Sequence, residues 1–233
     1  MARIGNEDMI ENEDYLGHKV YQALRHALRD GGISPGRFYS ETEFAEMLGV
    51  SRTPVREALK ALEREGVVIA AHRRGYRLRE FTEAEVDEIG ALREQLEVLV
   101  ARTLASNHNS HDLAALTDVI RRQDADSDGK SMFALDEEFH LLAAERAGLP
   151  RTRKILEGLR SVMAAVTAGV SIPHSETAQR VAEHDQIVFE ITQGNPDEAA
   201  RLMSEHIKAA HDTFREAIRA HVSAGPIIKP LDR

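Results

Sequence analysis

The chain has 233 residues, 42% of them hydrophobic and 30% charged, a balance typical of a globular protein long enough for two modest domains. It contains no cysteine, which excludes disulfides and thiolate-bound metal sites. No apolar run approaches about 18 residues and the N-terminus lacks an apolar signal core, so a cytoplasmic protein without membrane contact is expected.

The net charge of −9 is unevenly distributed along the chain. Residues 1–80 hold 13 basic and 13 acidic residues, so the excess of negative charge lies in residues 81–233. Within residues 37–79, nine basic residues outnumber six acidic ones. Because a locally basic face is sufficient for contact with phosphate groups, the N-terminal part is the candidate for nucleic-acid binding.

The first elements are a polar tail and a helix. Residues 1–14 are polar and acidic and are expected to form a mobile tail. Residues 18–29 carry apolar side chains on one face, which predicts a helix that Gly31 and Gly32 end. Residues 34–36, Ser-Pro-Gly, predict a turn.

Two short helices joined by a tight turn are predicted next. Ser40 and Glu43 have the spacing of a capping box, which predicts the start of the first helix. Gly49 can adopt the turn conformation at little steric cost. Ser51 is an N-cap residue type, and Pro54 suits the first turn of the second helix. This spacing is that of a helix-turn-helix.

The second of these helices has the features of a DNA-recognition helix. Its apolar face comes from Val55, Leu59 and Leu62, and Gly66 ends it. Base edges meet such a helix at its N-terminal end, away from the apolar face. Three residues there are the candidates for operator contact: Arg52, Thr53 and Arg56.

A β-hairpin is predicted after this helix. Residues 67–70 and 76–79 predict the two strands, and residues 71–75 the tip, so the N-terminal domain is a winged helix. The tip is basic, and contact with phosphates or the minor groove is expected from His72, Arg73 and Arg74. Gly75 would let the backbone approach DNA closely. The alternative is a hairpin tip that is charged only for solubility.

Residues 33–66, and above all the run Gly-Val-Ser-Arg-Thr-Pro-Val-Arg-Glu-Ala-Leu at 49–59, closely resemble the DNA-binding domain of GntR-family bacterial transcription regulators. The resemblance continues through the hairpin. It implies a regulator that binds double-stranded, palindromic operator DNA as a homodimer.

The chain is predicted to be wholly helical from Thr82, which has Glu85 at capping-box spacing. Breaks are expected near 107–110, 127–129, 148–150, 171–175 and 194–196, which leaves about six helices. The predicted fold is therefore mainly α, a winged helix-turn-helix at 15–80 followed by an all-α six-helix bundle at 81–222, with a tail at 223–233.

Four polar residues fall among the apolar residues of three bundle helices. Asp136 and His140 are spaced i, i+4, so both can point into the bundle at one level. His184 and His206 lie on the inner faces of two later helices. A divalent metal would satisfy all four, zinc first, with nickel, iron or manganese possible. The alternative is hydrogen-bonded core histidines with an Asp136–His140 pair. His211 is a competing ligand.

The motifs around these residues resemble the FCD effector domain of the FadR subfamily, in its VanR-like branch. The resemblance implies that Asp136, His140, His184 and His206 hold a metal whose coordination a small carboxylate effector completes. Arg93 lies on the apolar side of the first bundle helix. Its partner is Glu97, one turn on, or an acidic residue of another helix, or else the effector carboxylate.

The sequence therefore predicts a dimeric repressor that senses a small organic acid at a metal site, and not an enzyme. Two other functions stay open. In one, the metal itself is the signal. In the other, a metal with an open coordination position activates water for hydrolysis. Against hydrolysis, the sequence offers no spare residue as general base, and an enzyme would leave the DNA-binding module unexplained.

Overall fold

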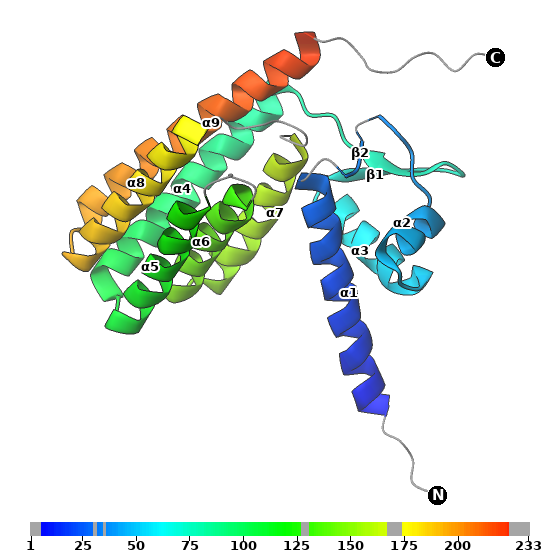
Figure 1. Cartoon of the computed structure of the whole chain (residues 1–233), viewed down its shortest axis with the longest axis horizontal. Helices are drawn as coiled ribbons and strands as arrows, with labels where there is room; N and C mark the ends of the chain where they lie inside the picture. The colour runs from blue at the N-terminus through cyan, green and yellow to red at the C-terminus, as the bar shows by residue number, and fades with distance from the viewer. Residues whose placement is uncertain (1–5, 30–31, 35, 127–130, 167–173, 224–233) are drawn as a thin grey trace, which may run out of the picture. The chain divides into compact units, whose positions relative to one another are not determined.

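The computed structural model describes residues 6–29, 32–34, 36–126, 131–166 and 174–223 (Figure 1). The chain forms two compact units and passes from the first to the second between Phe81 and Thr82. The elements of the N-terminal part are α1 (Asn6–Arg29), α2 (Glu41–Leu48), α3 (Arg52–Arg64), β1 (Val68–Ala71) and β2 (Gly75–Leu78). The predicted mainly helical fold with a winged helix-turn-helix is confirmed.

The helix-turn-helix forms through the local signals in its sequence. The hydroxyl of Ser40 accepts a hydrogen bond from the amide of Glu43 at 3.1 Å, and the Glu43 carboxylate accepts one from the Ser40 amide at 2.7 Å. Gly49 takes a left-handed conformation with φ 65° and ends α2. Ser51 precedes α3 in an extended conformation, without a side-chain capping bond.

The core of the N-terminal unit lies where α1 packs against α3. Its apolar side chains recur at helical spacing on both helices and are almost fully buried: Val20, Leu24, Leu28, Val55, Leu59 and Leu62. At the edge of this core, the Tyr21 hydroxyl donates a hydrogen bond to Glu65 at 2.7 Å, which ties α1 to the end of α3.

The wing is a two-stranded antiparallel hairpin in which Val68 pairs with Leu78 and Ala71 with Gly75. Tyr39 adds an isolated bridge to Tyr76, with two backbone hydrogen bonds of 2.8 Å. Gly75 has φ 91°, and a Cβ there would lie 2.2 Å from the carbonyl oxygen of Tyr39. The structural reason for this glycine is therefore the close approach of Tyr39, where the sequence suggested an approach of DNA.

Helix α1 is longer than the sequence indicated. A helix was expected over 18–29 after a mobile tail at 1–14, but α1 begins at Asn6, so residues 6–14 are helical and the predicted tail is wrong over that range. Acidic side chains near a helix start interact favourably with its dipole. The polar and acidic composition of this segment is thus compatible with a helix. Residues 1–5 lie outside the described part of the chain.

The second unit contains long helices that lie side by side (Figure 1). They are α4 (Glu83–Asn107), α5 (Ser110–Ala125), α6 (Met132–Arg146), α7 (Pro150–Val166), α8 (His174–Thr192) and α9 (Pro196–Ser223), so the described residues hold the six helices expected. The end of α7 from Ser161 and the end of α9 from Val222 are grouped with the first unit. Thr82 caps α4: its hydroxyl accepts from the Glu85 amide at 3.3 Å, and the Glu85 carboxylate accepts from the Thr82 amide at 3.0 Å.

The predicted helix breaks at 107–110, 148–150 and 194–196 are observed. The break at 127–129 and most of that at 171–175 lie outside the described residues, although His174 and Ser175 already belong to α8. Of the predicted C-terminal tail, Ser223 is instead the last residue of α9, and residues 224–233 are not described. None of the described helices is long and apolar enough to cross a membrane.

The core of the second unit is one apolar cluster to which all six helices, α4 to α9, contribute. Phe139, Leu116, Leu156 and Ile187 are completely buried in it. Four polar residues, described next, lie on the inner faces of α6, α8 and α9, among these apolar side chains.

Candidate metal centre and DNA-binding surface

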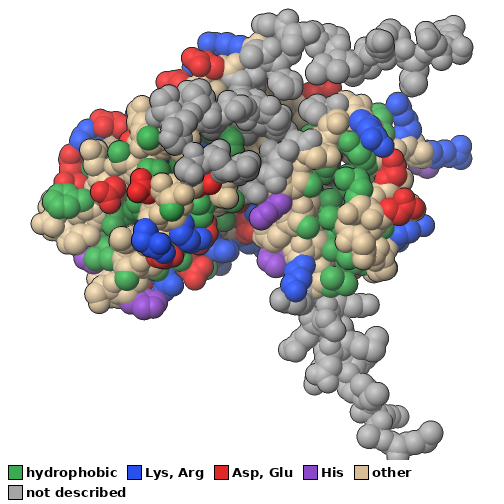
Figure 2. All heavy atoms as spheres, viewed as in Figure 1, with side chains coloured by type: hydrophobic (Ala, Val, Ile, Leu, Met, Phe, Trp, Pro, Cys, Tyr) green, Lys and Arg blue, Asp and Glu red, His purple; other side chains and the backbone are tan. Residues whose placement is uncertain are grey.

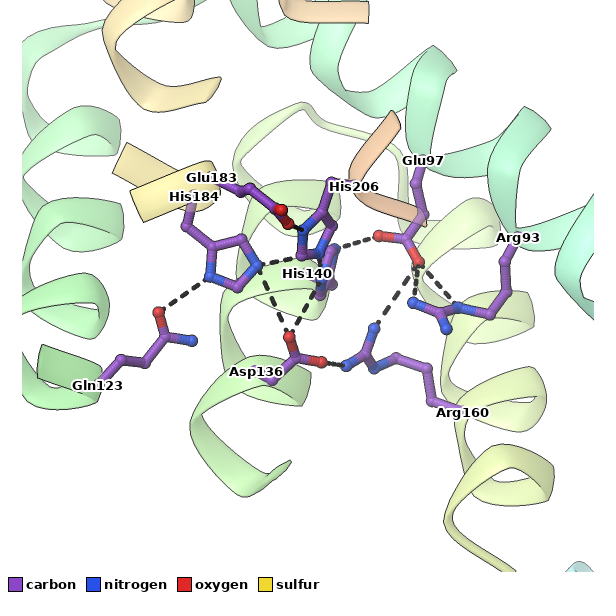
Figure 3. A network of polar contacts seen from close by, with 9 residues as sticks. All are labelled: Arg93, Glu97, Gln123, Asp136, His140, Arg160, Glu183, His184 and His206. Atoms are coloured by element: carbon purple, nitrogen blue, oxygen red, sulfur yellow. Dashed lines mark hydrogen bonds and ion pairs between the residues drawn. The ribbon is translucent and has the colours of Figure 1, made fainter. Parts of the chain in front are cut away.

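Asp136, His140, His184 and His206 come together in the helical unit, as their positions in the sequence predicted (Figure 3). Helix α6 supplies Asp136 and His140, one turn apart, while α8 supplies His184 and α9 His206. One ligand atom from each of the four residues lies within 4.8 Å of the others. The three imidazoles are at most 2% exposed and Asp136 is 8% exposed.

The three histidines point their Nε2 atoms toward one another. The Nε2 of His206 lies 3.2 Å from the Nε2 of His184 and 3.2 Å from that of His140. Oδ1 of Asp136 lies 3.6 Å from the His184 Nε2 and 3.7 Å from the His140 Nε2. Donor atoms bonded to one zinc ion at about 2.1 Å are separated by about 3.0–3.4 Å for bond angles between right-angled and tetrahedral. The donor set and its spacing therefore fit a divalent metal.

The other nitrogen of each ring faces a hydrogen-bond acceptor (Figure 3). The His184 Nδ1 lies 2.9 Å from the amide oxygen of Gln123, and the His206 Nδ1 lies 2.8 Å from the Glu183 carboxylate. The His140 Nδ1 contacts the carboxylate of Glu97. The ring of Phe139 stacks on His184 with 4.0 Å between ring centroids.

Two buried arginines lie beside the cluster. Arg160 of α7 pairs with the Asp136 carboxylate, and its Nη1 is 3.7 Å from Oε1 of Glu97. Arg93 of α4 donates two hydrogen bonds to the same Glu97 oxygen, from Nε at 3.1 Å and Nη2 at 2.9 Å. Of the partners expected for Arg93, the structure therefore shows Glu97. Both arginines are less than 10% exposed, so each needs an anionic partner.

Burial and charge act in opposite directions on the carboxylates of this cluster. Burial raises the pKa of Asp136, but the charges of Arg160 and His140 outweigh it and hold that pKa well below its usual range. Burial likewise raises the pKa of Glu97, and His140 and Arg93 reverse the effect, so that its pKa is also low. Both side chains are therefore carboxylates at neutral pH.

Burial lowers the pKa of His184 well below its usual value, and the nearby His206 and His140 lower it further. Burial also lowers the pKa of His206, against the opposing effect of its hydrogen bond to Glu183. These two imidazoles are therefore neutral at pH 7, the state in which Nε2 can bind a metal.

His211, the competing ligand, lies outside this cluster. Its Nε2 is 3.0 Å from Oδ1 of Asp87 on α4. Its ring lies against Gly90, where a Cβ would approach Nδ1 to 2.4 Å.

Sequence reasoning missed Gln123, Arg160 and Glu183. A helical signal was available for two of them. Gln123 follows the buried Val119 by four residues, and Arg160 follows the buried Leu156 by four, so both lie on the apolar stripes of their helices. Glu183 is only half-buried and carries no such signal.

The three residues predicted to contact the operator, Arg52, Thr53 and Arg56, are exposed in the first turns of α3. Both arginines hydrogen-bond to Glu41, which lies at the start of α2: Arg52 at 3.1 Å, and Arg56 with two bonds of 2.9 and 2.8 Å. The guanidinium groups are thus held together on one solvent-facing surface.

The predicted wing residues are also exposed: His72, Arg73 and Arg74. Basic side chains gather at the outer end of the hairpin (Figure 2). Arg73 has a left-handed backbone with φ 61°, as a tight hairpin turn requires. The guanidinium of Arg74 lies over the ring of Phe38, 4.1 Å from its centroid. This stacking orients Arg74 along the wing.

A winged helix-turn-helix with exposed arginines on its second helix, followed by a helical unit with a buried polar centre, defines a bacterial transcriptional regulator. Residues 16–78 match the bacterial regulatory proteins of the gntR family, and residues 88–209 match the FCD domain. The chain belongs to the GntR family and carries an FCD domain, as its motifs indicated.

Its relatives are regulators. The chain is 32% identical over 215 residues to an HTH-type transcriptional regulator of Streptomyces ambofaciens, covering 87% of this chain and 86% of that protein. It is 26% identical over 205 residues to the HTH-type transcriptional repressor RspR of Escherichia coli K12, covering 86% and 90%. These relatives confirm a transcription regulator as opposed to an enzyme.

Solved structures share the fold. Escherichia coli McbR/YncC superposes with a TM-score of 0.78 at 23% identity, over 86% of this chain and 97% of that one. A putative GntR regulator from Rhodococcus sp. RHA1 superposes with a TM-score of 0.72 at 22% identity, over 86% and 98%.

Proposed function

We propose that this regulator is a repressor that binds a palindromic operator as a homodimer and responds to a small organic acid through a divalent metal in its helical unit. The observation that carries the proposal is the convergence of three Nε2 atoms and one carboxylate oxygen beside two buried arginines, in a chain that also has a winged helix-turn-helix. Because its target is chromosomal DNA, the regulator acts in the cytoplasm.

The operator surface of the proposal consists of Arg52, Thr53 and Arg56, which enter the major groove from the start of α3. Arginine pairs with guanine edges or phosphates, and the free amides at a helix start favour phosphate. The basic wing tip contacts phosphates or the minor groove. The exposure of all these side chains supports this assignment.

The metal centre of the proposal consists of Asp136, His140, His184 and His206. Three imidazoles and one carboxylate suit zinc best, and also nickel, iron or manganese. A bound divalent cation would act as an electrophilic anchor for an oxygen ligand. The two negative charges of Asp136 and Glu97 are already balanced by Arg93 and Arg160, so a divalent cation adds positive charge that half-buried Glu183 offsets only in part. This balance supports an anionic effector.

The effector of the proposal is a small carboxylate that Arg93 binds in competition with its bond to Glu97. A guanidinium can hold a carboxylate with two parallel hydrogen bonds. Effector binding changes operator affinity only if the effector prefers either the DNA-competent or the DNA-incompetent state.

In the second candidate function, the metal itself is the signal. The same cluster supports it, because filling the site alone would join helices α6, α8 and α9.

The first test is the metal content of untagged protein purified without chelator, wild type against His184→Ala. We expect about one metal ion per subunit, lost in the variant. Wild-type protein that neither retains metal nor takes it up on addition would overturn the metal centre.

The second test is operator affinity with metal present, measured by fluorescence anisotropy with and without a panel of small organic acids. A change caused by one acid supports the proposed effector class, and a response to metal alone supports the metal-sensor function. Arg56→Ala should weaken operator binding while the metal content stays unchanged. Full operator affinity in this variant would contradict the assignment of α3.

A further inference from the structure

We propose that Gln123 and Glu183 are positioning residues of the metal centre: each accepts the Nδ1 proton of one histidine, so that the Nε2 lone pairs of His184 and His206 face the centre of the cluster. The inference rests on the proposed metal site and goes further, because it assigns roles to two residues that bind no metal themselves.

The tautomer of each ring decides which of its two nitrogen atoms can bind a metal. A neutral imidazole carries one proton, and the nitrogen without it has the lone pair that binds metal. The ionised Glu183 carboxylate can only accept, so the Nδ1 of His206, 2.8 Å away, must carry the proton. The Gln123 oxygen, 2.9 Å from the Nδ1 of His184, has the same effect. Both Nε2 atoms are then left unprotonated.

The Nε2 atoms of these two rings lie close together. His206 and His184 face each other with 3.2 Å between these atoms, which is within hydrogen-bond distance. If either ring moved its proton to Nε2, the pair would form an inward N–H···N bond, and that proton would occupy the place of the metal. The acceptors behind the rings oppose this arrangement, since moving the proton inward breaks a bond in which Nδ1 donates.

Gln123 differs from the carboxylates because its amide group can donate as well as accept. An amide can present oxygen or nitrogen, so rotation of the Gln123 side chain by half a turn would make it donate to His184 and place the proton on Nε2. Gln123 is 1% exposed, and in the described part of the chain its Nε2 has no hydrogen-bond partner. In the described residues the amide therefore contacts His184 through its oxygen, and a carboxylate at this position would exclude the donating orientation.

Glu97 stands behind His140 in the same way, but it also binds Arg93 and faces Arg160. Its replacement would take from the buried guanidinium of Arg93 the carboxylate it hydrogen-bonds to, and from Arg160 one of two nearby carboxylates, which mixes a positioning effect with a loss of stability. Gln123 and Glu183 are therefore the informative positions.

The experiment measures zinc affinity of the full-length protein by competition with a chromogenic chelator. In Gln123→Leu we expect a loss of about 10- to 100-fold, the usual effect of removing such a partner. Gln123→Glu keeps an acceptor that cannot rotate to donate and should bind zinc within about tenfold of wild type. Gln186→Leu makes the same change at an exposed position of α8 and should have no effect. Glu183→Ala should lose affinity, and Asp185→Ala, an exposed neighbour, should not.

A second readout is the tautomer itself, followed by long-range proton–nitrogen correlation spectra of the metal-free protein. Wild type should show His184 protonated at Nδ1, and Gln123→Leu should show a mixture or the Nε2 form. Equal zinc affinity in wild type and Gln123→Leu would overturn the inference, and so would equal losses in Gln123→Leu and Gln123→Glu, which would indicate packing alone. Wild-type protein that binds no zinc refutes the metal centre instead, and the spectra still test the tautomer.

Discussion

The carboxylate of Glu41 on α2 accepts two hydrogen bonds from Arg56 on α3, at 2.9 and 2.8 Å, and a third from Arg52 at 3.1 Å. A carboxylate from the first helix of the motif thus occupies the two arginines proposed to meet DNA. Operator binding must either replace these bonds or use the guanidinium groups in the orientation that Glu41 imposes. In both cases Glu41 affects how the protein distinguishes its operator from other DNA.

Replacing Glu41 with glutamine should strengthen binding to random-sequence DNA, by about three- to tenfold at low salt, because one negative charge leaves the phosphate-facing surface. Operator affinity should rise less, because Arg56 loses its fixed orientation. The ratio of operator to random-sequence affinity should therefore fall, as measured by anisotropy over a range of salt concentrations. Glu46→Gln removes the same charge from an exposed position of α2. Equal ratios in both variants would contradict a special role of Glu41.

Replacing Arg160 with leucine should destabilise the metal-free protein by about 3–5 kcal/mol, because Asp136 would be left buried without its main cationic partner. Urea unfolding in the presence of a chelator, at fixed protein concentration, measures this loss. Arg153→Leu on the same helix removes partly exposed pairs with Glu145 and Glu157 and should cost less than about 1 kcal/mol. Saturating zinc should reduce the Arg160→Leu loss, since the metal supplies positive charge. Similar losses in the two variants would show that the Arg160–Asp136 pair contributes little.

Gly75→Ala should displace the wing, because its Cβ would lie 2.2 Å from the carbonyl oxygen of Tyr39 and φ is 91°. We expect a loss of stability of about 1–3 kcal/mol and weaker operator binding, with unchanged metal content. Gly49→Ala serves as the control: φ there is also positive, at 65°, but nothing lies within 4 Å of the added atom. A smaller loss of stability in Gly49→Ala than in Gly75→Ala would show that the clash with Tyr39 adds to the strain of a positive φ. Equal losses of stability would argue against the clash.

The free energy of unfolding of the metal-free protein should fall as the pH drops below about 6.5. Burial lowers the pKa of His184 and His206 in the folded protein, so the unfolded chain binds protons that the folded chain excludes. The contribution of these two rings to stability is complete above the pKa that they have in the unfolded chain. It is lost as the pH falls from that value to the lower pKa that they have in the folded protein. The slope should approach about 2.7 kcal/mol per pH unit for two such groups.

Denaturant titrations between pH 5 and 8 with chelator present measure this slope. His184→Gln removes one titrating group and should flatten it. Stability that does not change between pH 5 and 6.5 would mean that the rings are already charged in the folded protein.

The DNA-binding unit was predictable because its signals are local. Ser40 and Glu43 cap α2, Gly49 makes the turn, and the run from 49 to 59 is long and specific. The metal-site residues were predictable for a related reason: each is a polar side chain at an apolar position of a helix. The contacts of Gln123 and Arg160 with the cluster depend on how α5 and α7 align with the other helices, which no spacing within one helix reveals. The Arg93–Glu97 contact differs, because it lies within α4 at i, i+4 spacing, and that spacing alone made Glu97 a candidate partner. The start of α1 was missed because its first turns carry no apolar stripe.

The capping box at Thr82 and Glu85 has a consequence for how such a protein can be rearranged. Both partners of the cap follow Phe81, so the local signal that starts α4 lies outside the winged helix-turn-helix. A gene fusion made between Phe81 and Thr82 would keep this signal whichever DNA-binding domain precedes it. The cap therefore marks this junction as the place at which a chimaeric regulator with another DNA-binding domain can be joined.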